Sequence, residues 1–572
     1  MGRNEADTGL AVSHEKVSTA TKLGISAESF QRRVVVEGDD QLNHTIKKRH
    51  LQMIAIGGSI GSGLFVGSGG ALSKGGPASL VLGFAIIGVL LFNVVYALGE
   101  MAVLFPVAGS FYTYSVRFID PAWGFAMGWN YVFQWAIVLP LELTVAALTV
   151  GFWGTNVNVG VWITVFLVII VALNVFGVLG YAEGEFWASI LKLSAVVIFL
   201  VIATVLVSGG APPNNMGRFC STNPNITSCY REYWGTRNWV NPGPFRNGFQ
   251  GFCSVFVTAA FAYSGTELVG LAASESKNPA KYLPGAVKQV FWRIILFYVL
   301  ALFFIGLLVR SDDDRLLGSG GLIDVNSSPF VIVAVNAGLK GFDSFINVII
   351  LISVVSIGMS GVYGGSRCLT ALADQGFAPK LFSYVDKAGR PLPATALILA
   401  FGLLAYVNIA AAGSVIFDWL LALSGLATLF TWGSICWAHI RFRKAWKLQG
   451  HTLDEIPFRA AWGVYGSWLG LIVIFFVLLA QFYVAISPIV LPGKPSLAPQ
   501  ERAQSFFKAY LALPVVLLFY VCGSLWKGSR IMRASDIDID TGRRVVDWEV
   551  INKERQRIAS MGFGKRLYHK LF

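Results

Sequence analysis

Long apolar runs recur along this chain of 572 residues, and they constrain its fold more than any other feature. A helix of about 20 apolar residues crosses the hydrocarbon core of a bilayer, which is about 30 Å thick. Counting the runs predicts about twelve spans, for example Leu80–Ala97, Val159–Val178, Phe186–Val207, Ile294–Val309, Ala396–Ala412 and Leu511–Leu525. Charged residues make up only 13% of the chain, which excludes an ordinary soluble domain. Unpaired sheet edges cannot lie in lipid and no alternating barrel pattern appears, so the prediction is an all-α integral membrane protein.

Basic clusters predict the orientation of the chain in the membrane. With an even number of spans they all fall on one side, which the positive-inside rule makes cytoplasmic, and they are Lys47–Arg49, Lys277/Lys281/Lys288, Lys380/Lys387/Arg390 and Arg441/Arg443/Lys444/Lys447. Both termini are therefore predicted to be cytoplasmic. The net charge of +13 is explained by this bias, so no nucleic-acid partner is expected. The polar first fifty residues show no removable signal peptide.

The charge distribution divides the chain into three parts. Residues 1–46 and 530–572 are rich in charge and lack long apolar runs, so we expect cytoplasmic tails. Residues 47–529 are predicted to form one transmembrane transporter domain. Within it, the short apolar segment Ala371–Phe382 is expected to lie at the membrane interface.

A long loop at about 209–248 is predicted to lie outside the cell. It contains Asn225 in the glycosylation acceptor sequence Asn-Ile-Thr, which makes this asparagine a glycosylation candidate. Cys220 and Cys229 lie nearby in the same loop. Two cysteines outside the cell can form a disulfide or remain free thiols, and both alternatives stay open.

Two predicted spans are interrupted by small residues. The first is broken at Gly57–Gly63 and the sixth at Ala262–Thr266. An offset of five spans inverts the direction of a helix in the membrane, so the fold is predicted to contain a 5+5 inverted repeat with two further helices. Broken spans in matching positions indicate a central binding site. Tight helix packing is the alternative explanation, because Gly57 and Gly61 are four residues apart.

Three ionisable residues inside predicted spans are candidates for proton coupling, because charge is costly in lipid. They are Glu142, Lys192 and Glu267. Two of them have a simpler alternative: Lys192 can extend its charge to the headgroups, and Glu267 can stabilise the first turn of a half-helix. Glu142 follows Pro140.

Gly57-Gly58-Ser59-Ile60-Gly61 also fits the nucleophile elbow of hydrolases. That pattern is short, the strand–turn–helix context is missing, and no histidine lies deep in a predicted span to act as a base. We therefore expect no enzymatic activity, no cofactor and no metal site.

Long stretches of the chain resemble the fungal amino acid permeases of the amino acid–polyamine–organocation superfamily, and most of all the general amino acid permeases. The resemblance covers about His44 to Gly542 and is carried by Gly57–Gly67, Gly76-Pro77 through Gly99-Glu100, Leu139–Leu143, Ser254–Ala273 and Asp418–Phe442. It implies a carrier fold shared with bacterial sodium-coupled carriers and proton-driven uptake at the plasma membrane.

The resemblance also implies a substrate site around Ser59–Gly63, Gly61 included. In relatives the substrate carboxylate meets backbone amides that correspond to Ser62 and Gly63. The ammonium group meets carbonyls that correspond to Ser59, Phe261 and Ser264.

Three further roles follow from the same resemblance. Lys192 matches a lysine that takes the place of a sodium ion in a proton-coupled relative. Ser424 is a candidate for discriminating between substrate side chains. Lys16 and Lys22 are candidate acceptors of ubiquitin from a ligase.

These observations predict a secondary active transporter that imports amino acids with protons and has broad specificity. A non-transporting amino acid sensor on the same fold is the main alternative, and a passive exchanger is the second. The resemblance implies a much longer N-terminal extension for the sensors.

Overall fold

The computed structural model describes residues 27–33, 46–212, 230–276, 278–317, 328–409, 413–489, 498–528 and 531–544, with scattered residues between 548 and 564. Within these ranges the regular structure is helical, and β pairing is confined to two isolated bridges. The all-α prediction is confirmed. Asn225, Cys220, Cys229, Lys16 and Lys22 lie outside the described residues.

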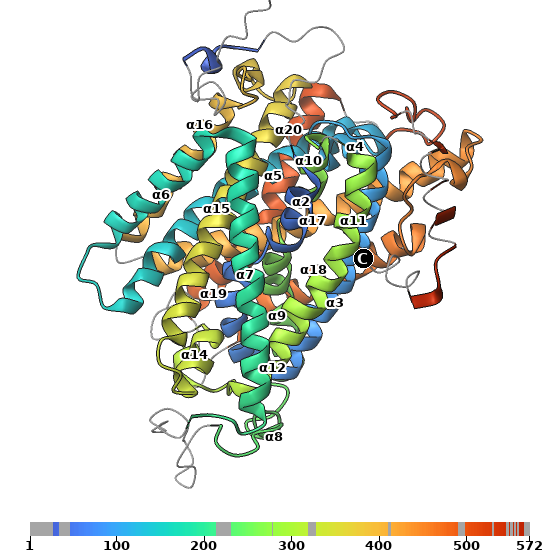
Figure 1. The fold of residues 1–572 in the computed structure, drawn as a ribbon. Coiled ribbons are helices and arrows are strands. Elements are labelled where there is room, and N and C mark those ends of the chain that lie inside the picture. Colours follow the sequence, from blue (N-terminus) through green and yellow to red (C-terminus); the bar gives the residue numbers. More distant parts are fainter. Residues whose placement is uncertain are drawn as a thin grey trace, which may run out of the picture.

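Seven helical stretches of the described chain are long and apolar enough to cross a membrane. They consist of η2 (Gly63–Gly67) with α3 (Ser68–Leu104), α5 (Pro121–Val150) with η3 (Gly151–Trp153), α7 (Gly177–Val207), α9 (Gly248–Tyr263) with α10 (Leu268–Ser274), α11 (Pro279–Trp292) with η4 (Arg293–Leu300) and α12 (Ala301–Leu308), α15 (Phe342–Asp374) and α18 (Gly463–Ile486). Figure 1 shows α7 running through the molecule, with α8 (Arg237–Val240) and α14 (Pro329–Asn336) near one end and α4 (Phe111–Phe118) toward the other.

The remaining helices are not among these seven stretches. The pair α19 (Pro499–Tyr510) and α20 (Ala512–Lys527) meets at 53° and makes an eighth candidate span. Further helices are α2 (Lys48–Gly57), α6 (Val159–Val175), α16 (Leu392–Phe401) with η7 (Gly402–Ile409), and α17 (Gly413–Leu448), while η1 (Ala27–Phe30), α13 (Asp314–Leu317), η6 (Lys380–Ser383) and η8 (Leu453–Glu455) are short. A multi-span helical fold is therefore confirmed, whereas the count of twelve and the inverted repeat stay predictions.

Gly76 bends the long helix α3 sharply. Its φ of +83° is outside the helical region and is readily adopted only by glycine. A Cβ there would also lie 2.8 Å from the carbonyl oxygen of Pro244. Pro77 follows directly and begins a new helical direction, because proline is favoured in a first turn. Two helical segments thus meet at a kink at this glycine.

Helix α15 continues farther than the sequence predicted. It runs to Asp374, and Ala371 is almost fully buried in its last turn. The prediction of an interfacial helix over Ala371–Phe382 is therefore wrong. The first four residues of this segment are the end of a span, and Lys380–Ser383 forms a separate short 3-10 helix. The polar residues that flank this segment made the end of the span look like a separate element.

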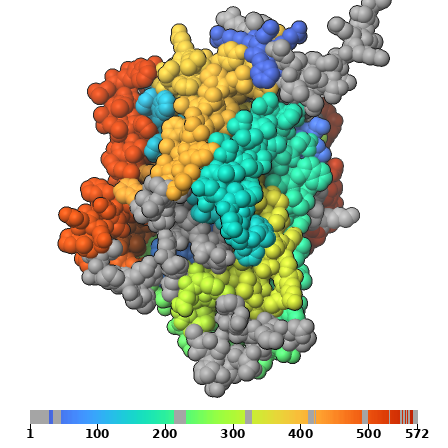
Figure 2. All heavy atoms as spheres, turned by 90° about the vertical axis from the view of Figure 1, so that its left-hand side faces the viewer, coloured from blue at the N-terminus to red at the C-terminus, as the bar shows by residue number. Residues whose placement is uncertain are grey.

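The spans differ in how much of their surface faces the surroundings. In the most apolar window of Pro121–Trp153, 83% of the residues are buried, against 28% for Gly463–Ile486. Helix α5 is thus central and α18 peripheral. Figure 2 views the face that includes α6 (teal), where Val161 and Val168 are among the exposed apolar side chains. Exposed valines at such density suit a lipid-facing helix.

Both terminal regions contact the membrane domain. The amide of Arg33 donates to the Val385 carbonyl at 3.0 Å, next to the short helix η1. In the C-terminal region, Met532 and Arg544 donate backbone hydrogen bonds of 3.0 Å to Ile119 and Leu104. The predicted boundaries at 46 and 529 stay predictions, but part of each predicted tail packs on the helices.

Candidate transport site

The first predicted break lies where helix α2 ends. The helix stops at Gly57, the chain lies outside regular helix from Gly58 to Gly61, and helical backbone resumes at Ser62, just before the π-helix η2 begins at Gly63. Gly63 is needed for a close approach between the two breaks, because a Cβ there would lie 2.5 Å from the Cα atom of Ala262. At least one glycine of this glycine-rich segment is therefore required by the close contact between the two breaks.

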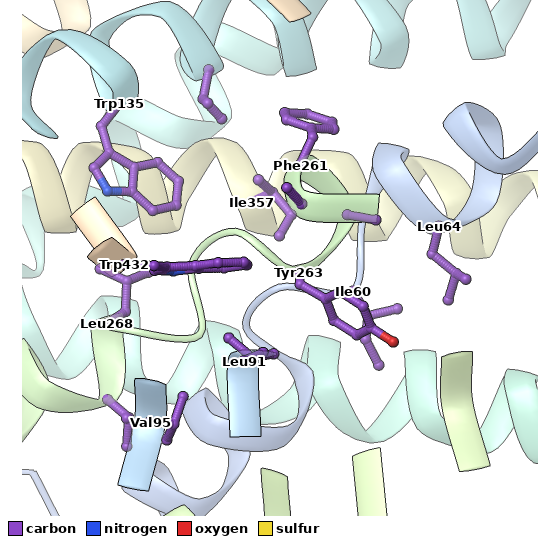
Figure 3. Close-up of a cluster of buried hydrophobic side chains, with 14 of the residues drawn as sticks. Ile60, Leu64, Leu91, Val95, Trp135, Phe261, Tyr263, Leu268, Ile357 and Trp432 are labelled. Carbon is purple, nitrogen blue, oxygen red and sulfur yellow. The ribbon is translucent and has the colours of Figure 1, made fainter. Parts of the chain in front are cut away.

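The second break separates α9 from α10. Helix α9 ends at Tyr263, and Gly265 adopts a φ of +91°, which glycine tolerates and other residues rarely do. The Thr266 hydroxyl donates to the Tyr263 carbonyl at 2.7 Å and satisfies one end of the broken helix. Figure 3 shows Phe261, Ile357 and Trp135 beside this segment. Both predicted interruptions are present.

One pocket lies between the two breaks, and in this structure it has room for about one water molecule. Seven residues predicted from the sequence line it: Ser59, Gly61, Ser62, Gly63, Glu142, Phe261 and Ser264. The other lining residues are Trp135, Val138 and Ile357, from α5 and α15. Trp135 was not among the residues predicted for the site.

Hydrogen bonds fix the polar groups of this cavity. The Ser62 hydroxyl donates to Glu142 at 2.6 Å, and both side chains are almost fully buried. The Gln134 amide donates to Ser264 at 2.8 Å and to Thr428 at 2.9 Å, which joins α5, the second break and α17. These contacts hold the two breaks against the central helices, so the cavity is pre-organised.

Lys192 lies behind the first break and not in the cavity. Its ammonium group donates to the Gly57 carbonyl at 3.0 Å, to Ser356 at 2.9 Å and to Glu185 at 3.3 Å, and the side chains of both ion-pair partners are fully buried. Extension to the headgroups is therefore excluded for Lys192. The lysine instead neutralises the negative C-terminal end of α2. Glu185 was missed, although a second ionisable residue in the same span was a usable signal.

Glu267 and Ser424 also lie outside the cavity lining. Glu267 is fully buried and accepts from the Gly265 amide and the Trp432 indole, both at 3.2 Å. Its place between the second break and α17 agrees with the structural alternative of a first-turn acid. Ser424 is buried on α17, and its carbonyl accepts from Thr428 at 3.0 Å.

Two polar residues of η4 also reach the breaks and were not predicted. Arg293 donates to the Ala55 carbonyl at 2.6 Å, and Tyr298 donates to the carbonyls of both breaks. The signal existed, since Arg293 directly precedes the apolar run that begins at Ile294, and a charge there deserved the same treatment as Lys192.

Comparison with known proteins gives matches along nearly the whole chain. The family model described as amino acid permease matches residues 50–534. "Amino-acid permease inda1" of Hypocrea atroviridis is 60% identical over 552 residues, which cover 96% of this chain and 93% of the relative. "General amino-acid permease GAP2" of Candida albicans is 48% identical, covering 96% and 91%, and "General amino-acid permease GAP1" of Saccharomyces cerevisiae is 45% identical, covering 96% and 90%.

Proposed function

Because the chain belongs to the amino acid permease family, we propose that it imports amino acids into the cell, with broad specificity and with protons as the driving ion. The observation that carries the proposal is the pocket that lies between the two interrupted spans. Carriers place their substrate site at such interruptions, near the middle of the membrane. The plasma membrane is the proposed location, with both termini in the cytoplasm.

The substrate carboxylate binds at the start of η2 in this proposal. The amides of Ser62 and Gly63 lie where the chain re-enters a helix, and the N-terminal end of a helix attracts anions. The ammonium group binds carbonyl oxygens at Ser59, Phe261 and Ser264, which line the same cavity. A zwitterion is thus held between the two breaks.

Broad specificity follows from this mode of recognition. Backbone groups contact only the carboxylate and the ammonium, which all amino acids share. The substrate side chain meets Trp135, Val138 and Ile357, which supply apolar contact without a charge. The relatives named as general amino-acid permeases support the same assignment.

Proton coupling is assigned to Lys192 and to the acids near it. An ammonium group that donates to Gly57 supports the first break from behind, so loss of its proton would release that contact. A membrane potential of about 100 mV supplies about 2.3 kcal/mol per charge, and each tenfold accumulation of a neutral zwitterion costs about 1.4 kcal/mol. One proton therefore sustains accumulation of some tens-fold.

Uptake of a labelled amino acid by cells that lack their own permeases tests this function. We expect saturable uptake that dissipating the proton gradient abolishes, and competition by many unlabelled amino acids. Lys192→Ala should remove the dependence of uptake on external pH while the protein still reaches the cell surface. Lys340→Ala, which changes an exposed lysine before α15, is the control and should behave as wild type.

Three results would contradict the proposal. Saturable binding without flux would indicate a sensor. Accumulation that survives loss of the proton gradient would indicate an exchanger. Unchanged pH dependence in Lys192→Ala would remove this lysine from the coupling mechanism.

A further inference from the structure

The π-helical segment η4 contacts both interruptions at once. Arg293, at its start, is fully buried, and its Nη1 atom donates to the Ala55 carbonyl in the last turn of α2 at 2.6 Å. Its Nη2 atom donates to the Thr266 hydroxyl in the second break. One guanidinium group therefore bridges the two broken spans from a third element.

Tyr298 makes a second bridge from the same segment. Its buried hydroxyl lies 3.0 Å from the Ser59 carbonyl oxygen and 2.8 Å from the Ala262 carbonyl oxygen. A hydroxyl has one proton, so the two carbonyls share it. These carbonyls belong to different broken spans and converge on a single point.

The helix type explains how both side chains reach the breaks. A π-helix closes its hydrogen bonds between residues five apart, and such segments concentrate at functional sites. Arg293 and Tyr298 are five residues apart within η4 and lie against each other, since the guanidinium carbon is 5.8 Å from the centre of the tyrosine ring.

Carbonyl oxygens exposed by broken helices have a known chemistry, because in carriers they coordinate the driving cation. Here a phenolic proton occupies one such pair, from Ser59 and Ala262, and a guanidinium group holds the end of α2. We propose that Arg293 and Tyr298 form a built-in clamp, which joins the two breaks and takes the place of a bound alkali cation. This inference rests on the proposed function, and both residues are positioning residues that do not contact the substrate.

The clamp makes a prediction about alkali cations. Tyr298→Phe removes one oxygen atom and leaves two converging carbonyls without their donor. We expect its maximal uptake rate to fall about tenfold or more and to recover partly when Na⁺ or Li⁺ is added. Wild-type uptake should not change when Na⁺ is replaced by choline.

Tyr230→Phe is the matched control. Tyr230 is equally buried, and its hydroxyl donates to the Leu308 carbonyl at 2.6 Å, away from the two breaks. Both variants lose one buried tyrosine hydroxyl that donates to backbone carbonyl oxygen. A purely structural role predicts the same small change in both, with no response to cations.

A binding measurement keeps the test independent of transport. In detergent, Na⁺ should raise the melting temperature of purified Tyr298→Phe by several degrees and leave wild type and Tyr230→Phe unchanged. Arg293→Lys keeps the positive charge, but an ammonium group lacks the planar guanidinium that donates to both Ala55 and Thr266. Uptake by this variant should therefore fall, and added Na⁺ or Li⁺ should not restore it.

The clamp is overturned if Tyr298→Phe matches Tyr230→Phe in uptake rate and in both cation responses. It is also overturned if wild-type uptake requires Na⁺. If the proposed function fails but the clamp is correct, the result is different. The wild-type protein then shows no uptake, while Na⁺ still raises the melting temperature of Tyr298→Phe.

Discussion

The Ser62 hydroxyl donates a 2.6 Å hydrogen bond to the Glu142 carboxylate and thereby ties the first break to the central helix α5. The other carboxylate oxygen of Glu142 has no hydrogen-bond partner among the described residues. Glu142 supplies the acidic group of the cavity lining. Its carboxyl group therefore faces the place where the substrate is proposed to bind.

Glu142→Gln should abolish the pH dependence of uptake. Glutamine keeps the shape of the side chain and can still accept from Ser62, but it cannot exchange a proton. Labelled uptake across a series of external pH values measures the effect. Ser62→Ala is the companion variant, because it keeps the acid and removes only its donor, so we expect slower uptake with the wild-type pH profile. An unchanged profile in Glu142→Gln would assign this acid a purely local role.

Removing the charge of Glu185 should destabilise the protein. Glu185 and Lys192 form a fully buried ion pair at 3.3 Å, and breaking such a pair from one side costs roughly 3–5 kcal/mol. Glu185→Gln should therefore lower the melting temperature in detergent and the amount at the cell surface. The double variant Glu185→Gln/Lys192→Met should regain much of the stability but no uptake. A double variant less stable than Glu185→Gln would contradict this account.

Features that depend on neighbouring residues could be predicted from the sequence, whereas contacts between residues far apart in the chain could not. Hydropathy and glycine density are local properties, so the spans and both breaks could be located from the sequence. Six of the cavity residues also followed from the motif resemblance, and a seventh, Glu142, followed from the cost of an ionisable group in a span. The contact of Gln134 with Ser264 and Thr428 joins residues that are 130 and 294 positions apart, and no periodicity encodes such a pairing.

Charged residues near the ends of apolar runs were the main omission. Glu185 was passed over near the predicted cytoplasmic end of a span, and Arg293 was excluded because the apolar run was drawn from Ile294. A charged residue lowers the mean hydropathy of a window, so spans chosen by hydropathy end just before such residues. Buried pairing, such as that of Glu185 with Lys192, cancels part of the cost and lets the charge lie inside.

Docking of the C-terminal segment should not depend on pH near neutrality. Glu455 contacts Arg543 at 3.3 Å, and hydrogen bonds from the Thr452 amide and from His451 lower the pKa of Glu455 to about 2. An acid whose pKa falls on folding stabilises the folded state above its unfolded pKa of about 4.3, and this contribution is lost only as the pH falls toward about 2. Because His451 also contacts Glu455 and histidine changes charge in this range, the test uses His451→Gln, in which hydrogen exchange of residues 531–544 should show equal protection at about pH 6 and about pH 8.

Glu455→Gln should weaken that docking at neutral pH. The variant keeps the shape of the loop but loses its attraction for Arg543, so residues 531–544 should exchange several-fold faster and be cleaved sooner by trypsin. Asp540→Asn is the control, because Asp540 is 3.8 Å from Arg543 and 80% exposed, and an exposed pair of this kind contributes little. Equal protection in Glu455→Gln and wild type would show that backbone contacts alone hold the segment.

Gly63→Ala should abolish transport by forcing the two breaks apart. The added Cβ would lie 2.5 Å from Ala262 Cα and 2.9 Å from its nitrogen, and backbone atoms at such distances cannot move without shifting a whole span. Gly67→Ala is the matched control in the same π-helix. There the nearest atom is a methyl group of Thr258 at 3.2 Å, which can turn aside, and alanine favours helix over glycine by about 1 kcal/mol.

We therefore expect opposite outcomes from two identical chemical changes four residues apart. Gly63→Ala should lose uptake and melt at a lower temperature, whereas Gly67→Ala should keep both close to wild type. Labelled uptake normalised to surface protein, together with melting in detergent, separates the effects. Wild-type uptake in Gly63→Ala would show that the breaks do not need their close contact, and the cavity between them would then have to form in a more open arrangement.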